Sequence, residues 1–244
     1  AARRSELWSS VFFSESPEKS SKPKTHRVLK FSKKTDWPKE ANRLTVLAEA
    51  TRKELPSGGH FIDLTESNPT RCGFKFLTSE ILKPLAASDS LSYQPDPRGS
   101  LTAREAVCRY YASKKINISP DQIVLTASTS EAYSFIFKLL IDPSGRAAVP
   151  APSYPLLASL LTLGDAAASN YRLFYEGRWR IDLQSLEESL RAGCRALCLI
   201  NPNNPTGNFI RQDDRSALNR LALKYGAALV SDEVFLDFKL DPEA

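Results

Sequence analysis

The sequence predicts an α/β fold of three layers, in which helices cover both faces of a mainly parallel, mixed β-sheet. Short apolar segments of strand length alternate with longer segments of helical periodicity through the second half of the chain. The strand segments, such as residues 196–200, are apolar along their length, which is typical of strands buried on both faces. Gly193 and Gly226 follow two of the expected helices, where a helix commonly ends.

The first expected helix begins near Pro38, has Leu44, Leu47 and Ala48 on one face, and ends before Pro56. A second helix begins at Ser100 and is expected to point Leu101, Val107, Cys108 and Tyr111 inward. The later expected strands cover residues 122–125, 147–149, 171–175, 196–200 and 227–230. The later expected helices cover residues 129–140, 154–163, 183–190 and 213–225. Residues 132–140 are apolar nearly all round, so this helix should be buried between layers.

The net charge of +5 is confined to one end of the chain. Residues 1–36 hold nine Lys or Arg against four Asp or Glu, and the rest of the chain balances 24 against 24. A basic tail without a basic stripe or an aromatic platform is a weak argument for nucleic acid, so no nucleic-acid partner is expected. Residues 1–36 are therefore interpreted as a basic, disordered tail.

Neither a metal site nor a membrane segment is expected. The four cysteines form no CxxC pair, and only two histidines accompany them. No apolar run reaches about 18 residues, and the first ten residues lack the apolar stretch of a signal peptide, so a cytoplasmic protein is the expectation. The chain has no methionine and ends soon after a strand, and we interpret it as a fragment open at both ends.

The loops that follow the strands are where such a sheet binds ligands. Ser128, Thr129 and Ser130 open the buried helix, where uncovered N–H groups and the positive end of the helix dipole can hold a phosphate. The alternative is that they are ordinary helix caps. After the next strand, prolines in residues 150–155 can hold Tyr154 rigidly so that its ring stacks on a planar ligand, or it is a core tyrosine.

Two further loops are rich in polar groups. Residues 200–207 read Ile-Asn-Pro-Asn-Asn-Pro-Thr-Gly, which places an amide donor at a strand end, unless the segment is only a turn. Asp232 and Glu233 end an apolar strand, and a carboxylate there needs a partner. A protonated pyridine nitrogen is one such partner, and solvent or an arginine is the alternative.

In this order the motifs resemble those of the class I and II aminotransferases, which are fold-type I pyridoxal-phosphate-dependent enzymes. The resemblance runs from about Leu44 to Phe238. It implies pyridoxal 5′-phosphate as cofactor, with its phosphate held by Ser128, Thr129 and Ser130. An amino acid and a 2-oxo acid are the implied substrates.

The resemblance also assigns the contacts to the cofactor ring and to neighbouring molecules. It implies that Tyr154 stacks on the ring, that Asn204 binds the phenolic oxygen, and that Asp232 pairs with the ring nitrogen. Tyr93 resembles the tyrosine that reaches the phosphate of the neighbouring subunit, which implies a homodimer. Ser67 and Asn68 lie in a segment that resembles the family's substrate-side loop.

Two departures from the family accompany this resemblance. Phe235 stands where the family commonly has a tyrosine that helps to bind the phenolic oxygen. The lysine to which the family attaches its cofactor lies a few tens of residues beyond the ring-pairing aspartate, so we expect no catalytic residue within these residues. Lys239 is too close to Asp232 to take that part and is interpreted as a surface residue.

The expected organisation is a tail at residues 1–36, a helix with an arm or small-domain portion at residues 37–85, and an incomplete cofactor domain at residues 86–244. Two alternatives to an aminotransferase remain at this point. The same scaffold serves decarboxylases, carbon–sulfur lyases and cyclopropane-forming synthases, because a fold does not fix the reaction. A short chain that uses its pocket only for binding or dimerisation is the other.

Overall fold

The computed structural model describes residues 31–35, 43–56, 59–62 and 68–238. The chain divides into two units, residues 1–36 and residues 37–244. In the first unit the described residues form one 3-10 turn, η1 (Lys33–Thr35). The disorder expected for the rest of the tail lies outside the described residues, as do Pro38, Ser67 and Lys239.

The second unit contains a five-stranded sheet in the order β3-β2-β1-β4-β5. The strands are β1 (Arg146–Ala151), β2 (Ala167–Tyr175), β3 (Trp179–Ile181), β4 (Cys194–Ile200) and β5 (Ala228–Asp232). The pairs β1–β2, β1–β4 and β4–β5 are parallel, and β2–β3 is antiparallel. The sheet is therefore mixed and mainly parallel, as predicted.

Seven α-helices lie in the described part of this unit. They are α1 (Arg43–Glu54), α2 (Thr78–Leu85), α3 (Leu101–Ser113), α4 (Thr129–Leu140), α5 (Leu156–Leu163), α6 (Leu183–Arg191) and α7 (Gln212–Tyr225). Three 3-10 turns, η2 (Pro69–Arg71), η3 (Ser88–Leu91) and η4 (Pro120–Gln122), lie between them. Helix α7 ends as expected at Gly226, which has a φ of 63°.

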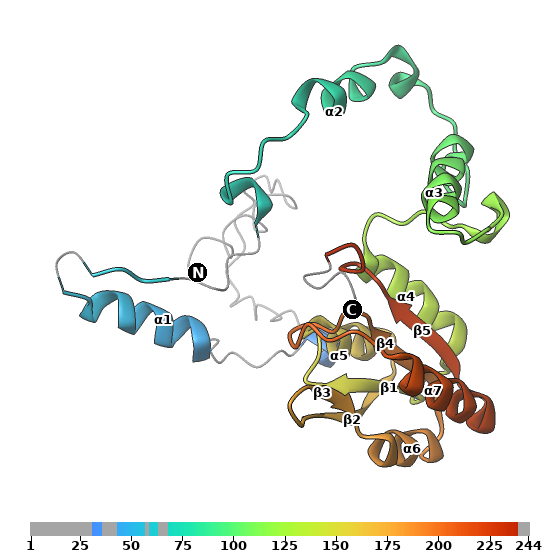
Figure 1. Cartoon of the computed structure of the whole chain (residues 1–244). Helices are drawn as coiled ribbons and strands as arrows, with labels where there is room; N and C mark the ends of the chain where they lie inside the picture. Colours follow the sequence, from blue (N-terminus) through green and yellow to red (C-terminus); the bar gives the residue numbers. More distant parts are fainter. Residues whose placement is uncertain (1–30, 36–42, 57–58, 63–67, 239–244) are drawn as a thin grey trace, which may run out of the picture. The chain divides into compact units, whose positions relative to one another are not determined.

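The central strands bury both of their faces. Along β4, Cys198 and Ile200 belong to a core with α4 and α5 on one face of the sheet, and Leu197 and Leu199 belong to a core with α6 and α7 on the other. This alternation follows from the two-residue period of a strand. The three predicted layers are thus present, and Figure 1 shows the helices on both sides of the sheet.

Two expectations about local structure were wrong, and one strand was not foreseen. Residues 122–125 pair with no strand among the described residues: η4 occupies their start, and Val124 is left 57% exposed. Leu101 is half exposed, and the buried residue of α3 is Arg104, whose guanidinium donates to the carbonyls of Gly99 and Pro120. Strand β3 was not foreseen, because a three-residue strand with an arginine at its centre gives no apolar run.

Candidate cofactor site

A hollow of about 170 Å3 lies where the ends of β1, β4 and β5 meet the start of α4. Parallel strands bring their carboxyl ends to one edge of a sheet, so loops far apart in sequence converge there. The hollow is lined by Thr129, Tyr154, Ile200, Asn204, Asp232, Val234 and Phe235. All four loops singled out in the sequence thus contribute a residue to one site.

The start of α4 offers free donors to this site. Ser128 caps the helix, since its Oγ accepts the N–H of Glu131 at 3.2 Å. The Glu131 carboxylate bends back and accepts the N–H of Ala127 at 2.6 Å. The N–H groups of Thr129 and Ser130 have no acceptor in the described part of the chain. The cap therefore leaves first-turn donors and the positive end of the helix dipole available to an anion.

In the asparagine-rich loop after β4, residues 200–207, two asparagines stabilise the loop and a third lines the hollow. Asn201 accepts the N–H of Ile210 at 2.9 Å. Asn203 is buried and donates to Thr206 Oγ1 at 2.7 Å and to the carbonyl of Pro152 at 3.3 Å. The bond to Pro152 ties the loop to its neighbour after β1, and the half-buried Asn204 lines the hollow. The segment thus forms a turn and also brings an amide to the hollow.

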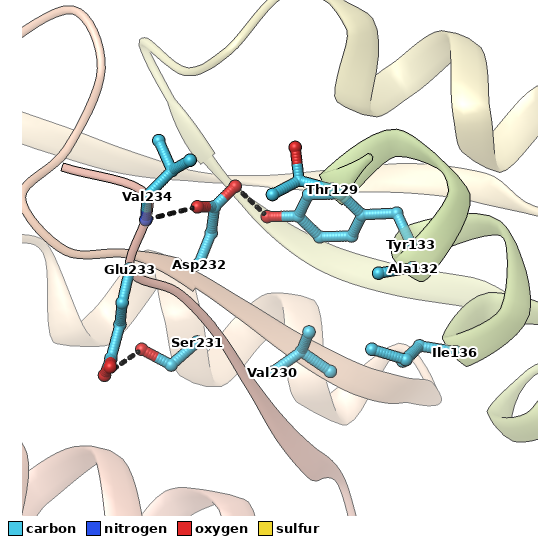
Figure 2. A pocket seen from close by; sticks show the side chains of 9 residues that line it. All are labelled: Thr129, Ala132, Tyr133, Ile136, Val230, Ser231, Asp232, Glu233 and Val234. Carbon is cyan, nitrogen blue, oxygen red and sulfur yellow. Dashed lines mark hydrogen bonds between the residues drawn. The ribbon is translucent and has the colours of Figure 1, made fainter. Parts of the chain in front are cut away.

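Asp232 ends β5, opposite Ile200 of β4, and its carboxylate is held at both oxygens. Its Oδ1 accepts the N–H of Val234 at 3.1 Å, and its Oδ2 accepts the hydroxyl of Tyr133 at 2.9 Å (Figure 2). Burial, chiefly, raises the pKa of Tyr133, so the phenol keeps its proton and remains a donor. Glu233 points the other way, toward the hydroxyl of Ser231 at 3.1 Å (Figure 2).

Tyr133 was not singled out as a site residue from the sequence. The available signal was its position four residues after Thr129, which puts both side chains on one face of α4. Tyr133 lies in the core beside α5 and β4, and Tyr154 is partly buried and packs against that core while it lines the hollow. The core interpretation of Tyr154 and its place at the site are therefore compatible.

The remaining predicted residues lie elsewhere. Tyr93 is 90% exposed and does not line the hollow. Asn68 caps η2 by accepting the N–H of Thr70 at 3.0 Å, and Ser67 falls outside the described residues. Phe235 presents an apolar ring to the hollow where a hydroxyl was the family's common feature.

The described residues contain neither a cluster suited to a metal ion nor a helix suited to a membrane. No cluster of three or more His, Cys, Asp or Glu that could hold a metal ion occurs among them. None of their helices combines the length and apolar character needed to cross a membrane.

The fold is an α/β domain with a hollow at the carboxyl ends of its parallel strands. The family model of class I and II aminotransferases matches residues 60–244, and the chain belongs to that family. The cofactor of this family is pyridoxal 5′-phosphate.

Relatives of known activity cover parts of the chain. Alanine aminotransferase 1 of Rattus norvegicus is 37% identical over 145 residues, which are 55% of this chain and 29% of that enzyme. The S-alkyl-thiohydroximate lyase of Arabidopsis thaliana is 30% identical over 156 residues, 64% of this chain and 34% of the lyase. The structure of alanine aminotransferase from Pyrococcus furiosus superimposes with a TM-score of 0.70 at 29% identity, covering 84% of this chain and 52% of that one. The chain thus spans about half the length of its relatives, or less.

Proposed function

We propose that this chain supplies most of the cofactor pocket of a pyridoxal-phosphate-dependent aminotransferase, which transfers an amino group between an amino acid and a 2-oxo acid. One observation carries the proposal: Thr129, Tyr154, Asn204 and Asp232 converge on one hollow. Their chemistry fits the parts of the cofactor, because the set combines anion donors, an aromatic face, an amide and a carboxylate.

The start of α4 is proposed to bind the phosphate. The N–H groups of Thr129 and Ser130 donate to phosphate oxygens, and the helix dipole adds a favourable charge. Ser128 contributes by capping the helix and so fixing the direction of these donors. A backbone site of this kind needs no lysine or arginine.

The loops after the strands are proposed to bind the ring. Tyr154 stacks on one face of the ring, and the Asn204 amide donates to the phenolic oxygen. Asp232 accepts from the ring nitrogen and keeps it protonated, since a carboxylate nearby favours the cation. When bound, the protonated cofactor draws electrons from the α-carbon of the amino acid. Phe235 has no hydroxyl, which leaves Asn204 as the proposed donor to the phenolic oxygen.

Tyr93, Ser67 and Asn68 are proposed to act at the edges of this site. Tyr93 reaches the phosphate of a neighbouring subunit in a homodimer, and its exposure leaves it accessible to such a partner. Ser67 and Asn68 lie on the substrate side. A cytoplasmic location is part of the same proposal.

A lyase reaction in the same pocket is the second candidate function. The observation that favours it is the 30% identity to a lyase over 64% of this chain. Both reactions need the same ring contacts, so the pocket alone supports either one. An assay for amino-group exchange with 2-oxo acids, set against an assay for cleavage of a carbon–sulfur bond, separates the two.

The pocket itself is tested by titrating the full chain with pyridoxamine 5′-phosphate in a calorimeter. Asp232→Ala removes the partner of the ring nitrogen and should weaken binding by roughly ten- to a hundredfold, as expected for a hydrogen bond between charged groups. Glu233→Ala is the matched control, because the neighbouring carboxylate is exposed and bonds to Ser231. Absence of saturable binding by the unaltered chain, or equal binding by both variants, would overturn the proposal.

A further inference from the structure

The hydroxyl of Tyr133 is a buried polar group that the proposed cofactor contacts do not use. Tyr133 is only 4% exposed, and its ring packs against that of Phe137 with 5.4 Å between the ring centroids. The hydroxyl crosses from α4 to the end of β5 and donates to Asp232 Oδ2 at 2.9 Å (Figure 2). A phenylalanine would fill the same space, so the hydroxyl needs an explanation beyond packing.

The bonds to the Asp232 carboxylate fix its orientation and leave it free to accept more. An ionised carboxylate has about four acceptor positions, and Tyr133 and the Val234 N–H occupy one on each oxygen. With both oxygens held, rotation of the carboxylate is restricted. The unused positions remain for a donor in the adjoining hollow, which Asp232 also lines.

The helix that carries Tyr133 also begins at the proposed phosphate site. Thr129 and Tyr133 are one turn apart on α4, and both line a second hollow of about 130 Å3 that Asp232 shares. The core around Tyr133 includes residues of α5, β1 and β4, so its hydroxyl is anchored to the rigid part of the domain. One buried helix therefore links the phosphate donors to the Asp232 carboxylate.

We propose that Tyr133 is a positioning residue: its hydroxyl holds the Asp232 carboxylate in the orientation that pairs with a protonated ring nitrogen. This inference rests on the proposed function. A donor bonded to one carboxylate oxygen fixes the direction in which the free acceptor positions point, so the ring nitrogen meets them in a defined geometry. Without the Tyr133 hydroxyl, the carboxylate is held less firmly and stabilises a protonated ring nitrogen less well.

The test compares two ligands on the full chain, pyridoxamine 5′-phosphate and its analogue with carbon in place of the ring nitrogen. The ratio of their dissociation constants isolates the contact to that nitrogen. Tyr133→Phe should reduce the preference for the natural ring by roughly three- to tenfold, the range of one hydrogen bond. It should also move the ¹⁵N signal of the bound ring nitrogen toward the value of a neutral pyridine.

Tyr171→Phe is the matched control. Tyr171 is equally buried, and its hydroxyl donates to the carbonyl of Cys198 at 2.9 Å, but it belongs to the core on the other face of the sheet. This variant should keep both the ligand preference and the ¹⁵N signal, while a thermal melt shows that both variants are folded. In an Asp232→Asn background, Tyr133→Phe should change the preference no further, because the hydroxyl acts through Asp232.

The outcomes separate this inference from the proposed function. If the unaltered chain prefers the natural ring and Tyr133→Phe keeps that preference and the ¹⁵N signal, the positioning role is overturned and the pocket stands. If Tyr133→Phe lowers the preference equally in the Asp232→Asn background, the route through Asp232 is wrong. If the unaltered chain shows no preference for the ring nitrogen, the proposed pairing of Asp232 fails and this inference fails with it.

Discussion

Two regions of the second unit are organised in different ways. From here on, residues 128–238 are called the sheet unit and residues 68–98 are called the arm. The sheet unit buries two cores, one on each face of the sheet, whereas every residue of the arm is exposed in the described structure. In the sheet unit, the Asp232 carboxylate is fixed by the Tyr133 hydroxyl and the Val234 N–H. Tyr93 of the arm is 90% exposed. The ring side of the site can therefore be tested in the chain alone, and the arm must be tested through assembly.

The largest contrast is expected in stability. Phe137→Ala in the sheet unit should lower the free energy of unfolding by about 3–5 kcal/mol. Phe137 is 1% exposed, so its removal opens a cavity in the core. Leu85→Ala in the arm should change it by less than about 0.5 kcal/mol, since Leu85 is 70% exposed. Urea denaturation followed by tryptophan fluorescence measures both. Equal losses would show that the arm is as firmly folded as the sheet unit.

A smaller contrast is expected between two asparagines. Asn203→Ala removes one donor bond to the loop after β1 and one within the loop after β4, and should cost about 1–2 kcal/mol. It should also weaken binding of pyridoxamine 5′-phosphate, because Asn204 is carried on that loop. Asn68→Ala removes the cap of a 3-10 turn without a buried residue and should cost about 0.5 kcal/mol or less. Urea titration and calorimetry check the pair, and an unchanged affinity in Asn203→Ala would show that Asn204 is placed by other contacts.

The arm should affect cofactor binding only in the assembled protein. Tyr93→Phe should weaken the affinity for pyridoxamine 5′-phosphate by roughly three- to tenfold where sedimentation shows a dimer, since one hydrogen bond to phosphate is lost. At concentrations where the chain is monomeric, the affinity should not change. A loss that is the same in the monomer would place Tyr93 in its own subunit's site.

The smallest contrast is expected in how the two regions affect stability at low pH. The N–H of Ser185, first, and the Arg172 guanidinium lower the pKa of Asp182 in the sheet unit. The N–H of Arg98, first, and Arg104 lower the pKa of Asp96 in the arm. A lowered folded pKa stabilises the protein above the unfolded value of about 3.9, and this stability is lost as the pH falls through the folded value.

The urea concentration at the midpoint of unfolding should therefore decrease as the pH is lowered from about 5 to about 3. Asp182→Asn, which keeps a cap for α6 but cannot titrate, should flatten this fall. Asp96→Asn should flatten it less, because the arm contributes little to the global unfolding. The opposite order would contradict the division between the two regions.

The sequence predicted the sheet unit well because its signals are local. Apolar segments such as residues 196–200 mark strands buried on both faces, and Ser128 and Gly226 mark helix ends through capping and φ, which nearby residues decide. Three loops of the site could be found for the same reason, since each follows a recognisable strand, and the fourth was found because Ser128 begins a helix. Their convergence on one hollow follows from the parallel order of the strands.

What the sequence did not predict depends on contacts across the chain. Residues 122–125 have the apolar character of a strand, but a strand also needs a hydrogen-bonding neighbour, and the described sheet offers them none. The bond between Tyr133 and Asp232 joins residues 99 positions apart, and the pattern around Tyr133 indicates only a buried helix. In α3, where an apolar inward face was expected, the buried residue is Arg104. Its charge is satisfied by backbone carbonyls and by Asp96.

A crystal structure of the chain soaked with pyridoxamine 5′-phosphate tests the central claim most directly. We expect phosphate oxygens at the N–H groups of Thr129 and Ser130, the ring against Tyr154, and the ring nitrogen within hydrogen-bonding distance of Asp232. A ligand bound elsewhere, for example in the hollow of about 470 Å3 beside Arg178 and Arg211, would contradict it.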